Sequence, residues 1–229
     1  MDGLITALEP QRRRGGLRVN VFVDGSFSFS LEKELAARLW VGQPIDQLKT
    51  VNLLREDEHT RAMDAALVYF TQRPRSEREL RDFLGRRETP PEVTESVVRR
   101  LGELDLVDDA AFARYWVENR QQHRPRGGRL LKLELRRKGI ADEIATEAVQ
   151  ASAEQEEPVT AAYRAGQRKA RALSKFEPRE FQNRLGQYLQ RRGFDYEAVR
   201  TAVRQLAADG LHDGVSFAAN RHRSRKVGI

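Results

Sequence analysis

Several features that would restrict the function of this chain are missing from its 229 residues. It contains no cysteine, which excludes disulfide bonds and thiolate metal sites and fits a reducing compartment such as the cytoplasm. It has no run of about 18 apolar residues, so no membrane span is expected. The first residues also lack the apolar core of a signal peptide. Together these absences predict a cytoplasmic protein without a membrane attachment.

The residue patterns of common enzyme and cofactor sites are missing as well. The chain has no glycine-rich loop followed by a phosphate-binding lysine and no Gly-x-Ser-x-Gly motif. Its four histidines do not have the spacing of metal ligands. Asp108 and Asp109 are the one carboxylate pair at a predicted joint, and we interpret them as a helix N-cap, with a metal or a basic partner as the alternative. The sequence therefore predicts no enzyme, no metal and no cofactor.

What the chain has in abundance is charge. A third of its residues are charged, and 41 Lys+Arg against 34 Asp+Glu give a net charge of +7. An excess of this sign favours polyanionic partners such as nucleic acid or an acidic protein surface. The high charge content also fits an array of small units, with much surface per residue, better than one large globule.

A short motif occurs three times along the chain. Each copy has two leucines four residues apart, followed by two or three basic residues, and the last two copies end in glycine. The copies occupy residues 80–88, 131–139 and 185–193, so their first leucines recur at intervals of 51 and 54 residues. Intervals near 50 without heptads indicate a tandem array of small helical units. Such arrays more often provide extended binding surfaces than buried active sites.

The first 59 residues differ from the rest and form the first predicted domain. Residues 4–8 and the alternating segment 17–23 are predicted strands. Asp24 and Gly25 predict a type I′ hairpin turn, because both central residues of that turn need a positive φ. Residues 26–30 are the predicted return strand, so the domain begins with a small antiparallel sheet.

Two helices are predicted after this sheet. Leu31, Leu35 and Leu39 share one face of a helix that ends before Pro44. Asp46 is the predicted N-cap of a second helix that runs to about residue 58. The sheet is expected to pack on these helices, because a small sheet alone is marginally stable.

Three three-helix repeats are predicted to follow, at residues 60–109, 110–156 and 157–210, before a basic tail at 211–229 that is predicted to be disordered. Phe112, Tyr115 and Trp116 lie at helical spacing and are predicted core residues rather than base-stacking ones. The predicted helix starts are the capping boxes of Ser76 with Glu79 and of Thr89 with Glu92, the Asp142 start and Pro178, and the predicted helix ends are Gly139, Gly193 and Gly210.

Basic residues concentrate in the middle repeat. On the predicted helix at residues 128–138 they occupy neighbouring faces, whereas Leu131 and Leu135 point to the core. The helix face could simply be solvated, but basic pairs recur at the same place in the other repeats, which favours an anion-binding surface. The candidate binding residues are Arg124, Arg126, Arg129, Lys132, Arg136, Arg137 and Lys138 in the middle repeat, Arg75, Arg78 and Arg81 in the first, and Arg191 and Arg192 in the third.

Several short motifs together resemble those of RecX-type regulatory proteins. They are residues 75–80 after Tyr69 and Phe70, residues 106–113, 124–127 and 133–140, and the hairpin at 21–25. The resemblance extends from about residue 4 to residue 210. It departs from the pattern at Glu88, where the other repeats have glycine, and at Gly128, a second glycine in its turn.

The resemblance implies a non-enzymatic modulator of the RecA recombinase. Such proteins lie in the helical groove of the filament that RecA forms on single-stranded DNA, and they restrain its ATPase, strand exchange and co-protease action. An array of three-helix units could contact several protomers and gain affinity by multivalency. The implied partners are this filament and, more weakly, single-stranded or double-stranded DNA, and the protein is expected to be a monomer.

Two other functions remain open at this stage. The basic helix at residues 128–138 could be the recognition helix of a helix-turn-helix protein that binds DNA directly. An enzyme such as a nuclease would need a constellation of carboxylates or histidines, which the sequence does not provide.

Overall fold

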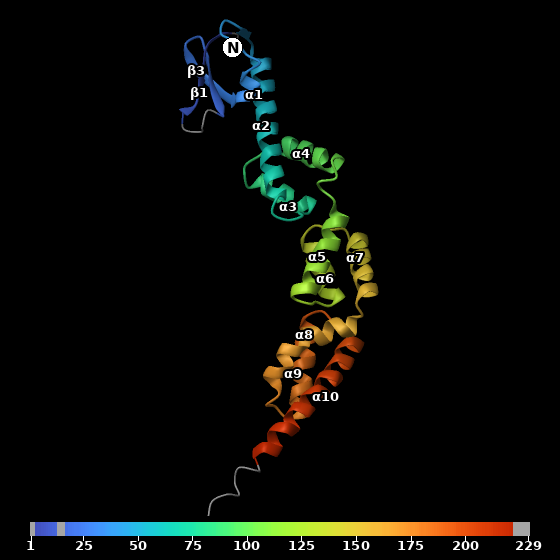
Figure 1. Ribbon diagram of the computed structural model, residues 1–229. Coiled ribbons are helices and arrows are strands. Elements are labelled where there is room, and N and C mark those ends of the chain that lie inside the picture. The colour runs from blue at the N-terminus through green and yellow to red at the C-terminus, as the bar shows by residue number, and fades with distance from the viewer. Residues whose placement is uncertain (1–2, 13–16, 222–229) are drawn as a thin grey trace, which may run out of the picture. The chain divides into compact units, whose positions relative to one another are not determined.

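The computed structural model describes residues 3–12 and 17–221, and for residues 210–221 it describes the helix without its side chains. Within these residues a small antiparallel sheet precedes three successive three-helix repeats, which confirms the predicted, mainly helical class (Figure 1). The chain divides into two compact units. Unit 1 comprises residues 1–73 and 79–107, and unit 2 comprises residues 74–78 and 108–229.

The sheet of unit 1 has the strand order β3-β2-β1-β4. The strands are β1 (Gly3–Pro10), β2 (Arg18–Val23), β3 (Ser26–Glu32) and β4 (Pro44–Ile45), and each neighbouring pair is antiparallel. Asp24 and Gly25 connect β2 to β3 with φ values of 49° and 80°, which confirms the predicted hairpin turn. The sequence did not predict β4.

The helix predicted after the hairpin is largely wrong. Leu31 lies in β3, because β3 continues to pair with β2 as far as Glu32, and α1 covers only Lys33–Ala36. Leu31, Leu35 and Leu39 are nevertheless buried in one core with Ile5. Leucines four residues apart therefore reached a common core through a strand end, a short helix and a turn.

Helix α2 (Gln47–Phe70) is continuous, so the break predicted near residues 58–62 is wrong. Its predicted start is confirmed, since the Asp46 carboxylate accepts a hydrogen bond of 2.6 Å from the Lys49 backbone N–H. No glycine or proline occurs in α2 to end it early. The domain boundary placed after residue 59 therefore falls inside one helix.

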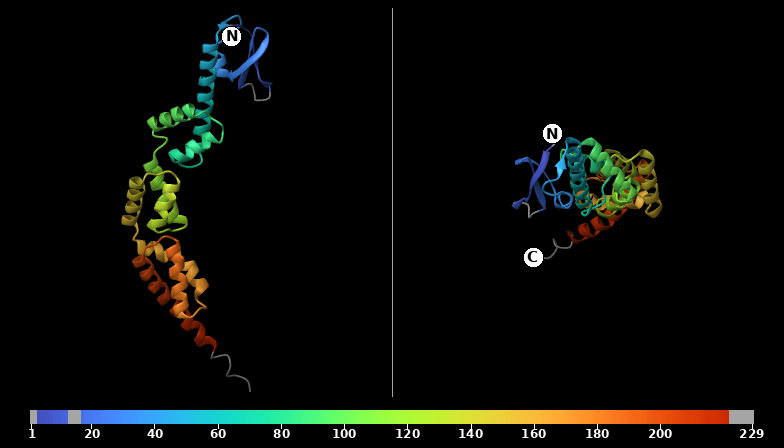
Figure 2. Two further views of the ribbon diagram at one scale, coloured as in Figure 1. Left: turned by 180° about the vertical axis from the view of Figure 1, so that it is seen from behind. Right: turned by 90° about the horizontal axis from the view of Figure 1, so that it is seen from above.

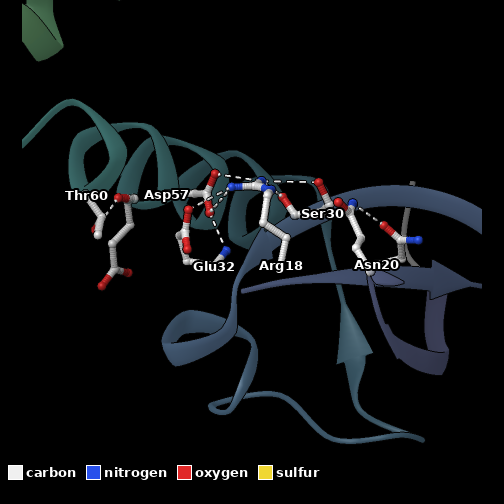
Figure 3. Close-up of polar contacts among 8 residues, drawn as sticks. Arg18, Asn20, Ser30, Glu32, Asp57 and Thr60 are labelled. Carbon is white, nitrogen blue, oxygen red and sulfur yellow. Dashed lines mark hydrogen bonds and ion pairs between the residues drawn. The ribbon is translucent and has the colours of Figure 1, made fainter. Parts of the chain in front are cut away.

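A buried polar network fastens the sheet to α2 (Figure 3). Arg18 of β2 is 8% exposed and Asp57 of α2 is 3% exposed, and an ion pair of 3.0 Å joins them. Arg18 also pairs with Glu32 at 3.3 Å and donates to the Ser30 carbonyl oxygen at 2.7 Å. Asp57 in turn accepts a bond of 2.6 Å from the Glu32 backbone N–H. Asp57 is thus a buried charged residue within an otherwise largely exposed polar stretch of α2.

Repeat 1 consists of the second half of α2 with α3 (Glu77–Gly85) and α4 (Pro91–Glu103). Helix α4 confirms a proline in the first turn but not the predicted capping box, because its N-cap is Pro90, without a side-chain hydrogen bond. At the start of α3, the Glu79 carboxylate accepts two bonds of 2.9 Å from Arg73. Glu88 has a φ of 60°, so it adopts the left-handed conformation for which the other repeats use glycine.

Repeat 2 consists of α5 (Asp109–His123), α6 (Gly128–Arg137) and α7 (Asp142–Gln155). Asp108 caps α5 by accepting bonds from the Ala110 and Ala111 backbone N–H groups. The Asp109 carboxylate accepts a bond of 2.9 Å from the Glu77 backbone N–H, at the start of α3. The two carboxylates therefore serve two different helices, which supports the structural interpretation of the pair.

Repeat 3 consists of α8 (Pro158–Leu173), α9 (Pro178–Arg191) and α10 (Tyr196–Arg221). Helices α8 and α10 lie side by side in both side views (Figures 1 and 2). Pro178 begins α9 as predicted, whereas Gly210 lies within α10 and does not end it. The predicted tail thus overlaps a helix up to Arg221, and its remainder, 222–229, lies outside the described residues.

Candidate functional site

Glu134 is the centre of the densest polar cluster in repeat 2. It lies on α6 between the buried residues Leu131 and Leu135, and it is itself 9% exposed. Its carboxylate accepts bonds of 3.0 Å from the Trp116 indole and 2.9 Å from the Arg120 guanidinium, and it pairs with Arg126. We call these four residues, Trp116, Arg120, Arg126 and Glu134, the Glu134 cluster.

The helical spacing of α5 prepares this arrangement. Trp116 and Arg120 are four residues apart and therefore share a face. The Arg120 guanidinium lies 4.1 Å from the centre of the Trp116 ring, and the Lys138 ammonium lies 5.1 Å from it. The predicted core role holds for Phe112, which is buried, and for Trp116, which is half-buried against the same core and also contacts two cations through its ring. Tyr115 is half-buried.

Two glycines bring repeat 3 against this cluster. The Gly127 backbone N–H donates to the Arg192 carbonyl oxygen at 2.9 Å, and a Cβ on Gly127 would lie 2.2 Å from the Gly193 carbonyl carbon. Gly193 has a φ of 86°, and a Cβ there would meet Leu130 at 2.4 Å. Only glycine permits so close a backbone approach. We call this contact the 2–3 joint.

The 2–3 joint adds a further arginine to the cluster. Arg192 follows the end of α9, donates to the Pro125 carbonyl oxygen at 3.3 Å and lies 4.9 Å from the centre of the Tyr188 ring. This position sets it beside the loop that carries Arg124 and Arg126. We refer to Arg120, Arg124, Arg126 and Arg192 together as the arginine cluster.

The arginine cluster carries more positive charge than its one buried carboxylate balances. Partial burial lowers the pKa of the Arg126 guanidinium, and the positive charges of Arg120, Arg192 and Arg124 lower it further. Arginine still remains protonated at neutral pH, so the crowding is a repulsion that a bound anion would relieve. The arrangement can hold a phosphate or carboxylate with several hydrogen bonds.

The other predicted binding residues of repeat 2 are dispersed. Arg129 is exposed and donates to the Gln190 carbonyl oxygen at 3.3 Å. Arg136 pairs with Asp142, with one bond of 2.8 Å, and this pairing lowers the pKa of the Asp142 carboxyl. Arg137 is exposed and Lys132 is half-buried. The basic residues of α6 therefore do not form a single uniform face.

The candidates outside repeat 2 fall into different surroundings. Arg81 in unit 1 makes two bonds to Glu95, of 2.8 and 3.0 Å, and thereby lowers the pKa of the Glu95 carboxyl. Arg75 and Arg78 belong to unit 2. Arg78 packs closely on Gly139, since a Cβ added to Gly139 would lie 2.5 Å from the Arg78 Cβ. Arg191 is exposed. Of the candidates, Arg124, Arg126 and Arg192 are brought together with Arg120, and Lys138 meets Arg120 at the Trp116 ring.

The sequence did not predict the role of Glu134 or the position of Arg192 in this site. Glu134 stood out in the sequence only as the acidic residue among the basic ones, and nothing showed that three side chains would converge on it. The position of Arg192 depends on the contact between Gly127 and Gly193, which are distant in the sequence. The spacing of Trp116 and Arg120 was the one local signal available.

The described residues contain no cluster of three or more acidic or histidine side chains placed to bind a metal ion. None of the described helices is long and apolar enough to cross a membrane. A tandem of three-helix repeats defines a helical-repeat protein, a class that commonly presents extended binding surfaces.

Comparison with known proteins identifies the family within this class. Models of the first, second and third RecX three-helix domains match residues 62–101, 108–149 and 155–203. The model of the regulatory protein RecX N-terminal domain matches residues 3–46. The chain therefore belongs to the RecX family of regulatory proteins.

Individual relatives agree with this assignment. The chain is 32% identical to the regulatory protein RecX of Levilactobacillus brevis, over 89% of this chain and 76% of that protein. It is 37% identical to the regulatory protein RecX of Thermobifida fusca, over 68% of this chain and 84% of that protein. A crystal structure of regulatory protein RecX superimposes with a TM-score of 0.64 at 24% identity, covering 90% of this chain and 99% of that one, and this likeness concerns the fold.

Proposed function

We propose that this protein regulates a RecA-type recombinase by binding its filament on single-stranded DNA, where it restrains ATPase, strand exchange and co-protease activity. The observation that carries the proposal is the match of four successive RecX domain models along the chain. The protein acts as a monomer in the cytoplasm and catalyses no reaction of its own.

The arginine cluster supports this proposal in physical terms. A nucleoprotein filament presents phosphates and acidic side chains, both of which pair with guanidinium groups. Arg124, Arg126 and Arg192 lie together in unit 2, where Glu134 pairs with Arg126 and Arg120. We assign the main electrostatic contact with the filament to this cluster, with Arg129, Lys132 and Arg137 on α6 as additional contacts.

The proposal is tested by the RecA ATPase on single-stranded DNA, with this protein added well below one molecule per protomer and DNA in excess. Inhibition at that ratio is expected, because one regulator in the groove contacts several protomers. No inhibition would contradict the proposal.

A matched pair of charge reversals locates the contact. Arg124→Glu with Arg137→Glu changes two exposed arginines of repeat 2 and should weaken inhibition. Arg168→Glu with Arg204→Glu makes the same change of charge at two exposed positions of repeat 3 and serves as the control. Equal losses in the two variants would mean that net charge acts, and not the position of these two arginines in repeat 2.

Direct DNA binding by a helix-turn-helix has less support from the geometry. Recognition helices contact bases with their first residues. The first turn of α6 instead adjoins repeat 3, through Gly127 against Gly193 and through Arg129 bonded to Gln190. Salt-sensitive binding to naked duplex DNA without any effect on the recombinase would favour this alternative.

A further inference from the structure

An open cleft of about 430 Å3 lies at the 2–3 joint, beside the arginine cluster. This volume is within the range of about 300–1,000 Å3 that is typical of ligand sites. The first turn of α6 forms one side, and the turn between α9 and α10 forms the other. The lining residues are Gly128, Arg129, Gln190, Gly193, Phe194, Asp195 and Tyr196.

The cleft has an exposed aromatic ring at its rim. Tyr196 is 68% exposed, whereas the neighbouring Phe194 is 5% exposed and belongs to the core of repeat 3. Tyr196 is the first residue of α10, whose start is fixed because the Asp195 carboxylate accepts a bond of 2.8 Å from the Ala198 backbone N–H. The cap fixes the backbone that carries Tyr196, and the exposed ring offers a face on which another flat ring can stack.

The polar side chains of the cleft complement this ring. Arg129 supplies a guanidinium, which is held near the turn by its bond to the Gln190 carbonyl oxygen. The Gln190 side-chain amide can both donate and accept hydrogen bonds, and the Asp195 carboxylate can accept them. Arg126 and Arg192 immediately precede the two glycines of the joint, so the positive charge of the arginine cluster adjoins the cleft.

From this arrangement we propose that the cleft holds one unpaired nucleotide of a single-stranded nucleic acid. The base stacks on Tyr196, its edge meets Gln190 and Asp195, and the adjoining phosphate pairs with Arg129. This inference deepens the proposed function and rests on it, since the filament contains a single strand.

The chemistry favours a single strand over the other polyanions that a basic surface could attract. Bases in a duplex are stacked on one another and do not offer a free face to a tyrosine, whereas unpaired bases do. The acidic side chains of a peptide offer no flat ring that could stack on Tyr196. A neutral base with N–H donors fits both the ring and the carboxylate.

The test is the binding of a fluorescein-labelled oligothymidylate, followed by anisotropy with the full chain and without recombinase. Tyr196→Ala should weaken binding about 5- to 150-fold, the factor that corresponds to the loss of one stacked base. Tyr196→Phe should retain the affinity, because the ring remains. Trp40→Ala removes another exposed aromatic residue, in unit 1, and should change nothing.

The salt dependence separates stacking from charge. Arg129→Ala should lower the slope of log affinity against log salt by about 0.7, the value for one phosphate of a single strand, whereas Tyr196→Ala should leave the slope unchanged. Far-ultraviolet circular dichroism and thermal melting confirm that each variant is folded. Unchanged binding by folded Tyr196→Ala would overturn the inference.

Two further measurements distinguish the remaining occupants. The affinity for a duplex of the same length should be less sensitive to Tyr196→Ala than the affinity for the single strand. Equal losses of affinity for the two ligands would overturn the assignment to an unpaired base. Displacement of the oligonucleotide by polyglutamate at equal charge concentration would point to an acidic peptide and also overturn it. The ATPase assay tests the proposed function separately. A wild-type protein that binds the single strand without lowering the ATPase activity of the recombinase would contradict only the proposed function.

Discussion

Asp57 in unit 1 and Glu134 in unit 2 are both buried carboxylates on helices, and both bind arginine. Asp57 shares the single guanidinium of Arg18 with a second carboxylate, Glu32, so the acidic groups outnumber the basic one. Glu134 instead receives both Arg120 and Arg126. The first site has a surplus carboxylate around a buried guanidinium, whereas the second leaves a positive surplus on arginines that are partly exposed.

This difference separates a structural ion pair from a binding surface. A buried pair that loses a partner is strongly destabilised, because the remaining charge has no water to solvate it. Partly exposed arginines keep contact with water and can exchange it for an incoming anion. The sign of the surplus charge and the exposure of the arginines therefore indicate function better than the presence of an arginine–carboxylate contact does.

The largest effect should follow the removal of the closed network. Asp57→Asn leaves Arg18 without its shortest carboxylate contact and should lower the free energy of unfolding by about 3 kcal/mol, measured by urea denaturation. Glu56→Gln is the control, because its pair with Arg38 is exposed on both partners and should be worth less than about 1 kcal/mol. Equal losses would contradict the distinction drawn for Asp57.

The next largest effect should come from separating the two halves of the arginine cluster. Gly127→Ala places a Cβ against the Gly193 backbone, which cannot turn aside, and should cost about 1–3 kcal/mol in thermal denaturation. Oligonucleotide affinity should fall with it, because Arg192 and the cleft both depend on this contact. Gly102→Ala, where a Cβ would meet nothing within 4 Å, should leave affinity intact and should not lower stability, because alanine favours a helix more than glycine does.

A smaller effect is expected from neutralising the open site. Glu134→Gln keeps the shape of the side chain and should cost about 1–2 kcal/mol, less than Asp57→Asn, because Arg120 and Arg126 reach water. Sulfate should restore more of the lost stability in Glu134→Gln than in Asp57→Asn, each measured relative to the wild type in the same solution. The same recovery in both variants would show that the two sites do not differ in access to anions.

The smallest effect on stability is expected at the exposed ion pair of Arg136 and Asp142. The pKa of the Asp142 carboxyl is lowered in the folded state, so its contribution is present above the unfolded value near 3.8 and is lost as the pH falls through the folded pKa. Asp142→Asn should therefore change stability slightly at neutral pH and not at all at strongly acid pH. Unfolding curves across that range check this, and a growing difference toward acid pH would contradict the sign.

Local sequence signals correctly predicted several turns and helix ends. Gly139 and Gly193 both have positive φ, with values of 87° and 86°, and they follow their helices as predicted. The hairpin turn at Asp24 and the cap at Asp46 are equally local, and both are confirmed. Such positions depend on the conformation of one or two residues, which the residue type itself restricts.

The contacts that the sequence did not predict join residues that are far apart in the chain. Asp57 lies in the predicted second helix, but its buried role depends on Arg18, which lies 39 residues away. The arginine cluster depends on Arg192 meeting Pro125 across 67 residues. The candidate residues were therefore identified by type, but which of them share a site was not predictable from spacing along one helix.

The unbroken course of α2 has a consequence for how this chain can change by insertion. Leu53 packs in the core beneath the sheet, whereas Ala62, nine residues later, packs in the core of repeat 1. Nine residues correspond to two and a half turns, so the two cores use opposite faces of the helix, about 13.5 Å apart along its axis. One added residue between them would rotate every later side chain by about 100°. The number of residues between Leu53 and Ala62 therefore fixes the angle between the two buried faces of α2. An insertion that keeps this angle must add whole helical turns.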